Sequence, residues 1–134
     1  MQSAQNHIEV AAAVIEKNGS FLITQRLKKS HLGHLWEFPG GKLEAGETPE
    51  ECLVRECREE LGIVVKPLRK IQELTHSYSD LTVRLHFWLC EHLSGTPRAI
   101  ECADLCWTKP EDLIRYEFPE ADREILKRLA QRTI

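Results

Sequence analysis

One segment, residues 48–61, carries both a start and a stop signal for a helix, and it constrains the fold more than any other part of the chain. Thr48 and Glu51 have the spacing of a capping box, in which each side chain bonds to the backbone N–H of the other residue. Pro49 falls at the first helical position, where its missing N–H costs nothing. Gly62 is the residue type that usually follows a helix end. The sequence therefore predicts a helix over about 48–61.

Three carboxylates crowd the surface of this predicted helix. Glu56, Glu59 and Glu60 lie on neighbouring positions, because residues three and four apart share a helix face. An apolar stripe runs beside them and consists of Leu53, Cys57 and Leu61. Like charges at this spacing cost roughly a few tenths of a kcal/mol per pair, and more when partly buried. A divalent cation such as Mg²⁺ would offset that repulsion, because it prefers oxygen ligands and bridges carboxylates to phosphates.

A simpler interpretation is a solvated charged surface. Arg55 and Arg58 lie among the acids and can neutralise them without any metal. For an acidic helix taken alone, the solvated surface is the commoner arrangement. The choice therefore depends on the sequence on either side of the helix.

The rest of the chain contains apolar strands separated by turns. Residues 8–16 and 20–26 flank an Asn18-Gly19 pair, which is typical of an antiparallel hairpin. The pattern indicates further strands over 71–80, 81–91 and 105–108, a loop over 27–35, and helices over 110–116 and 119–132. These elements predict an α+β fold with helices on the faces of a mixed, largely antiparallel sheet.

Composition narrows the class of protein. The 134 residues, 42% hydrophobic and 29% charged, fit one globular domain over 1–134. The net charge of −3 gives no positive field for a nucleic-acid backbone, so we expect no direct nucleic-acid binding. No apolar segment approaches the ~20 residues that span a bilayer, and no secretory signal opens the chain. We expect a cytoplasmic protein that does not bind membranes, and a monomer because no coiled-coil heptads are evident.

The cysteines do not suggest a disulfide framework or a zinc site. They are five in number and form no C-x-x-C pair. An odd number cannot all pair within one chain. We therefore interpret them as reduced core residues; they are Cys52, Cys57, Cys90, Cys102 and Cys106.

The sequence around the acidic helix resembles the Nudix box. Its fixed letters are Gly41, Glu47, the pair Arg55-Glu56, the pair Glu59-Glu60, and Gly62. At average residue frequencies these seven letters would coincide at a given start less than about once in a hundred million. By this resemblance the chain is identified as a Nudix hydrolase, which implies an α/β/α sandwich with 48–61 as the catalytic helix.

The resemblance also assigns roles within the box. It implies that Glu56 and Glu60 are the principal ligands of Mg²⁺, or of Mn²⁺ in its place, and that Glu59 assists them. Backbone carbonyls of Gly40 and Gly41 are further candidate ligands, since the glycine turn lets the backbone approach closely. Arg55 belongs to the catalytic set as a fork that holds a neighbouring carboxylate, and Glu47 supports the site from its edge.

Outside the box, the chain resembles the MutT-type 8-oxo-dGTP diphosphatases. The segments LITQR, HLGHLWEFPGGK and FPEAD carry this likeness. It implies nucleotide contacts from Arg26, His31, Glu37, Phe38, Pro39 and Gly40, and a base-reading role for Asp122. An ionised Asp122 accepts hydrogen bonds only, which suits the N1–H and N2–H₂ edge of guanine. Glu101, in a loop before Trp107, is a further candidate for contact with the metals or the attacking water.

Together these features predict a Mg²⁺-dependent nucleoside triphosphate pyrophosphohydrolase that converts 8-oxo-dGTP to 8-oxo-dGMP and pyrophosphate. This reaction would remove the oxidised nucleotide from the nucleotide pool and so limit mutation. The expected partner is a small nucleotide, and either Glu101 or Glu56 accepts the proton of the attacking water. Two alternatives remain. One is hydrolysis of CTP or a modified dCTP, and the other is a catalytically silent nucleotide-binding Nudix module.

Overall fold

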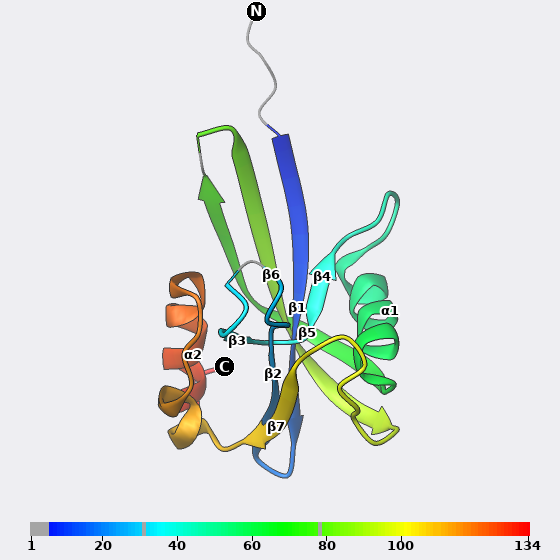
Figure 1. The fold of residues 1–134 in the computed structure, drawn as a ribbon, viewed down its shortest axis with the longest axis vertical. Helices are drawn as coiled ribbons and strands as arrows, with labels where there is room; N and C mark the ends of the chain where they lie inside the picture. Colours follow the sequence, from blue (N-terminus) through cyan, green and yellow to red (C-terminus); the bar gives the residue numbers. More distant parts are fainter. Residues whose placement is uncertain (1–5, 31, 78) are drawn as a thin grey trace, which may run out of the picture.

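The computed structural model describes residues 6–30, 32–77 and 79–134, which form a twisted sheet between two helices (Figure 1). The elements in chain order are β1 (Asn6–Lys17), β2 (Ser20–Gln25), β3 (Trp36–Glu37), β4 (Gly40–Lys42), α1 (Pro49–Leu61), β5 (Val64–Ser77), β6 (Leu81–Ser94), β7 (Asp104–Thr108), the 3₁₀ helices η1 (Pro110–Arg115) and η2 (Glu120–Asp122), and α2 (Arg123–Ala130). Helices α1 and α2 lie on opposite sides of the sheet. The predicted α/β/α sandwich is therefore confirmed.

The sheet is mixed, as predicted. Its main path runs β3-β2-β1-β6-β5, while β4 pairs with β1 and β7 pairs with β2. Strands β1 and β6 are parallel from Asn6↔Leu81 to Glu16↔Glu91, and the other pairs are antiparallel. The β1–β2 hairpin turns through Asn18 and Gly19, both at positive φ, which these two residue types tolerate.

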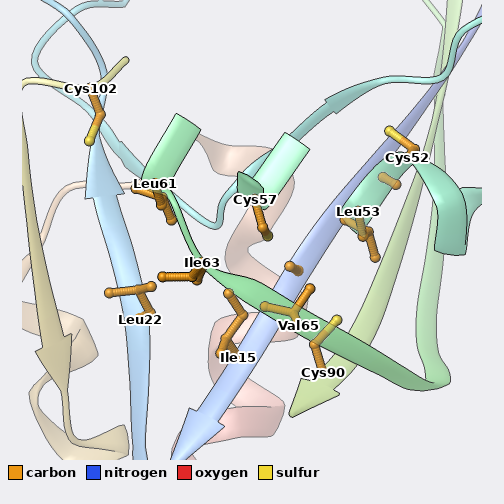
Figure 2. Close-up of a cluster of buried hydrophobic side chains, with 12 residues drawn as sticks. Ile15, Leu22, Cys52, Leu53, Cys57, Leu61, Ile63, Val65, Cys90 and Cys102 are labelled. Carbon is orange, nitrogen blue, oxygen red and sulfur yellow. The ribbon is translucent and has the colours of Figure 1, made fainter. Parts of the chain in front are cut away.

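Alternation along the central strand divides the core into two layers. On β1, Ala11, Ala13 and Ile15 face α1, whereas Ala12 and Val14 face α2, because successive side chains point to opposite faces of a strand. The layer under α1 contains the predicted apolar stripe of the helix, and Figure 2 shows it packed against β1, β2 and β5. Burial of this stripe is what orients the acidic face of α1.

The layer under α2 holds the C-terminal part of the chain to the sheet. Ile125 and Leu129 are fully buried on the inner face of α2. Arg128 donates to the backbone carbonyl of Ile71 and to the side chain of Gln72 on β5. These contacts fix the position of η2 and of Asp122, which immediately precede α2.

Several element boundaries differ from the expectations. The helix expected over 110–116 is a 3₁₀ helix, and the one expected over 119–132 is split into η2 and α2. Strand β5 begins at Val64, earlier than expected, since the capped end of α1 leads almost directly into the sheet. All five cysteines are free, in agreement with the sequence interpretation. None of the described helices is long and apolar enough to cross a bilayer.

Candidate active site

The capping box that was read from the sequence is present at the start of α1. The Glu51 backbone N donates to Thr48 Oγ1 at 3.1 Å, and the Thr48 backbone N donates to Glu51 Oε1 at 2.9 Å. At the other end, Gly62 adopts a left-handed conformation with φ of 68°. The helix therefore starts and stops at fixed positions, which sets the height of its acidic residues above the sheet.

Arg55 joins the acids of this region. Its guanidinium forks onto Glu47 with contacts of 2.7 and 2.9 Å. The same group donates to Glu56 Oε1 at 2.6 Å and to Glu59 Oε2 at 3.2 Å. The hydrogen bond from Arg55 lowers the pKa of Glu47 to about 2. Arg55 thus contacts both Glu47 and Glu56, and the fork that the sequence suggested for it falls on Glu47.

Glu60 has no such partner. Its Oε2 atom is buried and makes no hydrogen bond with any residue that the structure describes. Burial raises the pKa of Glu60, and the neighbouring Glu56 carboxyl, Glu37 and Glu101 raise it further. A buried carboxyl surrounded by other acids lacks the positive charge that would stabilise its ionised form. The solvated-surface interpretation therefore accounts for Glu47 and Glu59 but not for Glu60.

The glycine turn lies directly against the acidic helix. A Cβ atom on Gly41 would come within 2.7 Å of Glu56 Oε2, so a larger residue at this position would displace the Glu56 carboxylate. A Cβ atom on Gly40 would come within 2.0 Å of the Ala11 carbonyl, because β4 and β1 pair closely. The Gly41 carbonyl lies 3.5 Å from the Cys52 sulfur. Participation of the Gly40 and Gly41 carbonyls in metal binding stays a prediction.

The donor set can be tested for its fit to a divalent cation. Among the described residues, no three His, Cys, Asp or Glu side chains form a ready-made cage. A complete cage is not required, because Mg²⁺ is commonly held by one or two carboxylates together with waters and substrate phosphates. Glu60, with its unpartnered oxygen, and the adjacent Glu56 supply two such carboxylates. The residues present fit Mg²⁺.

A loop after β6 is attached to the C-terminal end of α1. The backbone N atoms of Ile100 and Glu101 donate to the Glu60 carbonyl at 3.1 and 3.3 Å. The Arg98 backbone N donates to the Leu61 carbonyl at 3.0 Å. These bonds occupy carbonyls that a helix end leaves without partners. They also place the exposed Glu101 close enough to Glu60 to influence its pKa.

A cavity of about 320 Å³ adjoins the glycine turn on the other side. Six of the residues that the sequence assigned to the site line it: Arg26, Glu37, Phe38, Gly40, Gly41 and Asp122. Pro39 is buried and its carbonyl accepts a bond of 2.7 Å from the Ala13 N–H, so its role is to hold the turn. His31 lies outside the described residues. A larger groove beside η1 and α2 contains none of the assigned site residues.

Two carboxyls with different surroundings face this cavity. Glu37 Oε1 accepts from Arg26 Nη1 at 2.9 Å, yet burial raises the Glu37 pKa overall. Asp122 is 6% exposed, and burial followed by repulsion from Glu37 raises its pKa to about 7. Asp122 therefore populates both its ionised and its protonated form near neutral pH. Asp122 occupies the N-cap position of α2, but its side chain makes no capping hydrogen bond.

Phe38 combines two roles that the sequence left open. It is 4% exposed and packs against Phe87 and Phe118, with ring centroids 6.4 and 5.4 Å away. Part of it lines the cavity. Phe38 is therefore a core aromatic that also forms one wall of the cavity.

Comparison with known proteins decides the family. The model of the NUDIX domain matches residues 10–128. The chain belongs to the Nudix family. The CTP pyrophosphohydrolase of Escherichia coli strain K12 is 39% identical to it over 120 residues, covering 90% of this chain and 89% of that protein. The 8-oxo-dGTP diphosphatase of the same strain is 34% identical over 123 residues, covering 91% and 95%.

Solved structures agree with this assignment. The solution structure of the E. coli ORF135 protein superposes on this Nudix hydrolase with a TM-score of 0.84 at 37% identity, covering 95% of this chain and 91% of that one. A MutT protein from Methanosarcina mazei Go1 gives the same TM-score at 22% identity, covering 98% of both chains, a likeness that shows the fold alone.

Two features of this Nudix site were missed by sequence reasoning. Lys42 lines the cavity, and its position immediately after the Gly40-Gly41 pair was the signal that could have found it. The attachment of residues 98–101 to α1 had no such signal, because backbone N–H groups make these bonds whatever the side chains are.

Proposed function

We propose that this Nudix pyrophosphohydrolase acts on nucleoside triphosphates and that its preferred substrate is 8-oxo-dGTP, with residues 1–134 acting as one catalytic domain. The observation that carries the proposal is the cavity that holds Glu37 and Asp122 and ends at Gly41, which lies against Glu56. A nucleotide whose base enters this cavity reaches the acidic helix with its phosphates. The products would be a nucleoside monophosphate and pyrophosphate.

The residues of the helix have separable tasks in this reaction. Glu56 and Glu60 would hold Mg²⁺, with Glu59 at the exposed edge and Arg55 fixing the Glu56 rotamer. Bound Mg²⁺ supplies charge neutralisation for the phosphates and lowers the pKa of a coordinated water. Glu101 or Glu56 accepts the proton as water attacks phosphorus. Most of the rate then comes from positioning and electrostatics, as in other phosphoryl transfers.

The cavity supports a base-reading role for Asp122. Its carboxyl is almost fully buried and has no hydrogen bond or ion pair with another described residue. A buried polar group without a partner is costly, so a ligand that satisfies it gains affinity. The ionised form matches the two donors on the guanine edge. This contact reads guanine without reading the oxidised C8 atom, for which backbone groups around Phe38 are the candidates.

A second candidate function is hydrolysis of CTP or a modified dCTP. The E. coli relative that is 39% identical bears the name CTP pyrophosphohydrolase. Cytosine presents an acceptor at N3 and a donor at N4. A neutral Asp122 carboxyl has one donor and one acceptor, which complements that edge. Because its pKa is raised, Asp122 carries a proton more readily, and this supports hydrolysis of a cytosine nucleotide as a second candidate function.

The test is a ranking of nucleotides by kcat/KM with Mg²⁺ present. We expect 8-oxo-dGTP to rank first, with monophosphate and pyrophosphate as the products. The cytosine candidate replaces the first if CTP or 5-substituted dCTP ranks above every purine. Glu60→Gln serves as the background control, because turnover that depends on this site should fall roughly 10²-fold or more in the variant. Wild-type protein that is no faster than this control on every nucleotide would leave only the silent binding module.

A further inference from the structure

The strand that carries the glycine turn is attached to α1 by a thiol. Cys52 lies near the start of α1 and is fully buried. Its sulfur is 3.5 Å from the Gly41 carbonyl oxygen and 3.6 Å from the Lys42 carbonyl oxygen. A thiol donates a hydrogen bond over such distances, because sulfur is larger than oxygen. Cys52 therefore connects the helix directly to the backbone of β4.

Arg55 makes the same connection about one turn further along the helix. Its Nη2 atom donates to the Lys42 carbonyl at 3.2 Å and to the Cys52 sulfur at 3.8 Å. The thiol thus accepts from the guanidinium while it donates to β4. A thiol buried away from water keeps its proton, so Cys52 remains a donor. Two neighbouring side chains of α1 therefore hold two consecutive carbonyls of β4.

This contact lies where the two parts of the candidate metal site meet. Glu56 and Glu60 belong to α1, whereas the candidate carbonyl ligands of Gly40 and Gly41 belong to β4. The two parts are close, since a Cβ atom on Gly41 would lie 2.7 Å from Glu56 Oε2. Because the candidate ligands come from two elements, the spacing of β4 from α1 determines whether they reach one cation.

A second thiol provides a comparison within the same core layer. Cys90 on β6 is almost as deeply buried, and its sulfur donates to the Trp88 carbonyl at 3.6 Å (Figure 2). Trp88 is on the same strand as Cys90, so this bond connects no two elements. Both thiols fill space in the core. Of the two, Cys52 alone attaches the helix to the glycine turn.

We propose that Cys52 is a positioning residue that, together with Arg55, holds the Gly40-Gly41 turn at the distance from Glu56 at which α1 and β4 contribute ligands to one divalent cation. The proposal rests on the proposed function, since it assumes that Glu56 and Glu60 hold this cation. Cys52 touches neither the cation nor the substrate. It acts through the spacing of β4 from α1.

The experiment compares Cys52→Ala with Cys90→Ala, each of which removes one buried thiol from the same core layer. The first measurement needs no metal. The Leu43 backbone N, at the end of β4, donates to the Glu9 carbonyl at 2.9 Å, so its amide hydrogen exchange reports opening of this strand. In metal-free protein we expect this exchange to become roughly tenfold faster in Cys52→Ala and to stay unchanged in Cys90→Ala.

The second measurement is the Kd of Mn²⁺, obtained by electron paramagnetic resonance of the free ion without nucleotide. We expect Mn²⁺ to bind roughly tenfold more weakly to Cys52→Ala, because the turn no longer stays beside Glu56. For the same reason kcat should fall while the KM for the nucleotide stays near its wild-type value. Cys90→Ala should retain the wild-type Kd, kcat and KM, although thermal unfolding should show a comparable loss of core packing in both variants.

A second pair of variants separates the hydrogen bond from the packing. Cys52→Val fills the space of the thiol but has no donor, so it should show the same faster exchange and weaker Mn²⁺ binding as Cys52→Ala. Cys90→Val is its control and should bind Mn²⁺ as wild type does. This pair also decides the question if the alanine variant of Cys52 does not fold.

The outcomes distinguish this proposal from the proposed function. Wild-type exchange at Leu43 and wild-type Mn²⁺ affinity in the Cys52 variants would overturn it, and so would equal losses in the Cys90 variants, which would mean that core packing is the cause. Wild-type protein that binds no Mn²⁺ would instead contradict the proposed metal site. The exchange of Leu43 would then still decide whether Cys52 holds the turn.

Discussion

The acidic helix and the cavity lined by Glu37 and Asp122 both contain clustered carboxyls, but they balance charge in different ways. On the helix, Arg55 contacts Glu47, Glu56 and Glu59, and only Glu60 is left with a buried, unpartnered oxygen. In the cavity, Arg26 contacts Glu37, and Asp122 has no cationic partner among the described residues. Each cluster therefore contains one acid whose charge is not neutralised by the protein.

The difference lies in what completes each cluster. Glu60 lies among Glu56, Glu37 and Glu101, all of which disfavour its ionisation, so a cation is needed there. Asp122 faces an apolar cavity, where a proton or the hydrogen-bond donors of a base satisfy it. We infer that the helix handles any triphosphate, whereas the cavity selects the base. The following changes test this division.

Glu60→Gln is expected to have the largest effect on activity. It removes a ligand from the metal site and should lower kcat by roughly 10²-fold or more for every nucleotide. Without metal, the free energy of unfolding should stay equal or increase, because a buried carboxyl whose raised pKa costs folding free energy at neutral pH is replaced by a neutral amide. The measurements are steady-state kinetics and urea unfolding in the presence of a chelator. Wild-type activity in this variant would remove the helix from the reaction.

Gly41→Ala tests the contact between the two regions. The added Cβ would lie 2.7 Å from Glu56 Oε2, so the Glu56 side chain has to move. We expect kcat to fall roughly tenfold or more with little loss of stability, because the group that must move is the end of a flexible side chain.

Gly40→Ala is the matched comparison, measured by thermal unfolding. Its Cβ would meet the Ala11 carbonyl at 2.0 Å, which is backbone of a central strand and cannot move cheaply. We expect a loss of about 3 kcal/mol or more of stability. A Gly41→Ala variant as unstable as Gly40→Ala would contradict the distinction between the two glycines.

The two regions also differ in how far the sequence could predict them. The helix is contiguous, so the spacing of Thr48, Glu51 and Gly62 determined its ends, and the i to i+4 rule placed its acids. The cavity is assembled from the end of β2, from β3, β4 and η2, which no periodicity brings together. Only the resemblance to MutT-type proteins assigned Arg26, Glu37 and Asp122 to the same site. The raised pKa of Asp122 was not predictable, because it depends on burial and on Glu37, which is distant in the sequence.

Arg55→Lys is expected to have a smaller effect on stability. Lysine keeps the charge but loses the fork onto Glu47, which should cost roughly 1 to 2 kcal/mol at neutral pH. Because the native pKa of Glu47 is lowered to about 2, its contribution is complete above the unfolded value of about 4.5 and is lost as pH falls through about 2. The difference between wild type and variant in urea unfolding should therefore disappear over that interval.

Arg58→Lys on the same helix provides the control for this effect. Arg58 is exposed and forms no ion pair within the described part of the chain. Its substitution should leave acid unfolding unchanged. An equal pH-dependent loss in both variants would mean that the effect comes from the net charge of the helix and not from the fork between Arg55 and Glu47.

The most direct test of the division between helix and cavity is the ratio of kcat/KM for 8-oxo-dGTP to that for dCTP, measured at about pH 8 in wild type, Glu60→Gln and Asp122→Ala. Glu60→Gln should lower both values by the same factor and leave the ratio unchanged. Asp122→Ala should lower the ratio by roughly tenfold, since it removes the group that accepts from guanine and repels cytosine. A ratio that changes in Glu60→Gln, or stays constant in Asp122→Ala, would contradict the assignment of phosphate chemistry to the helix and base selection to the cavity.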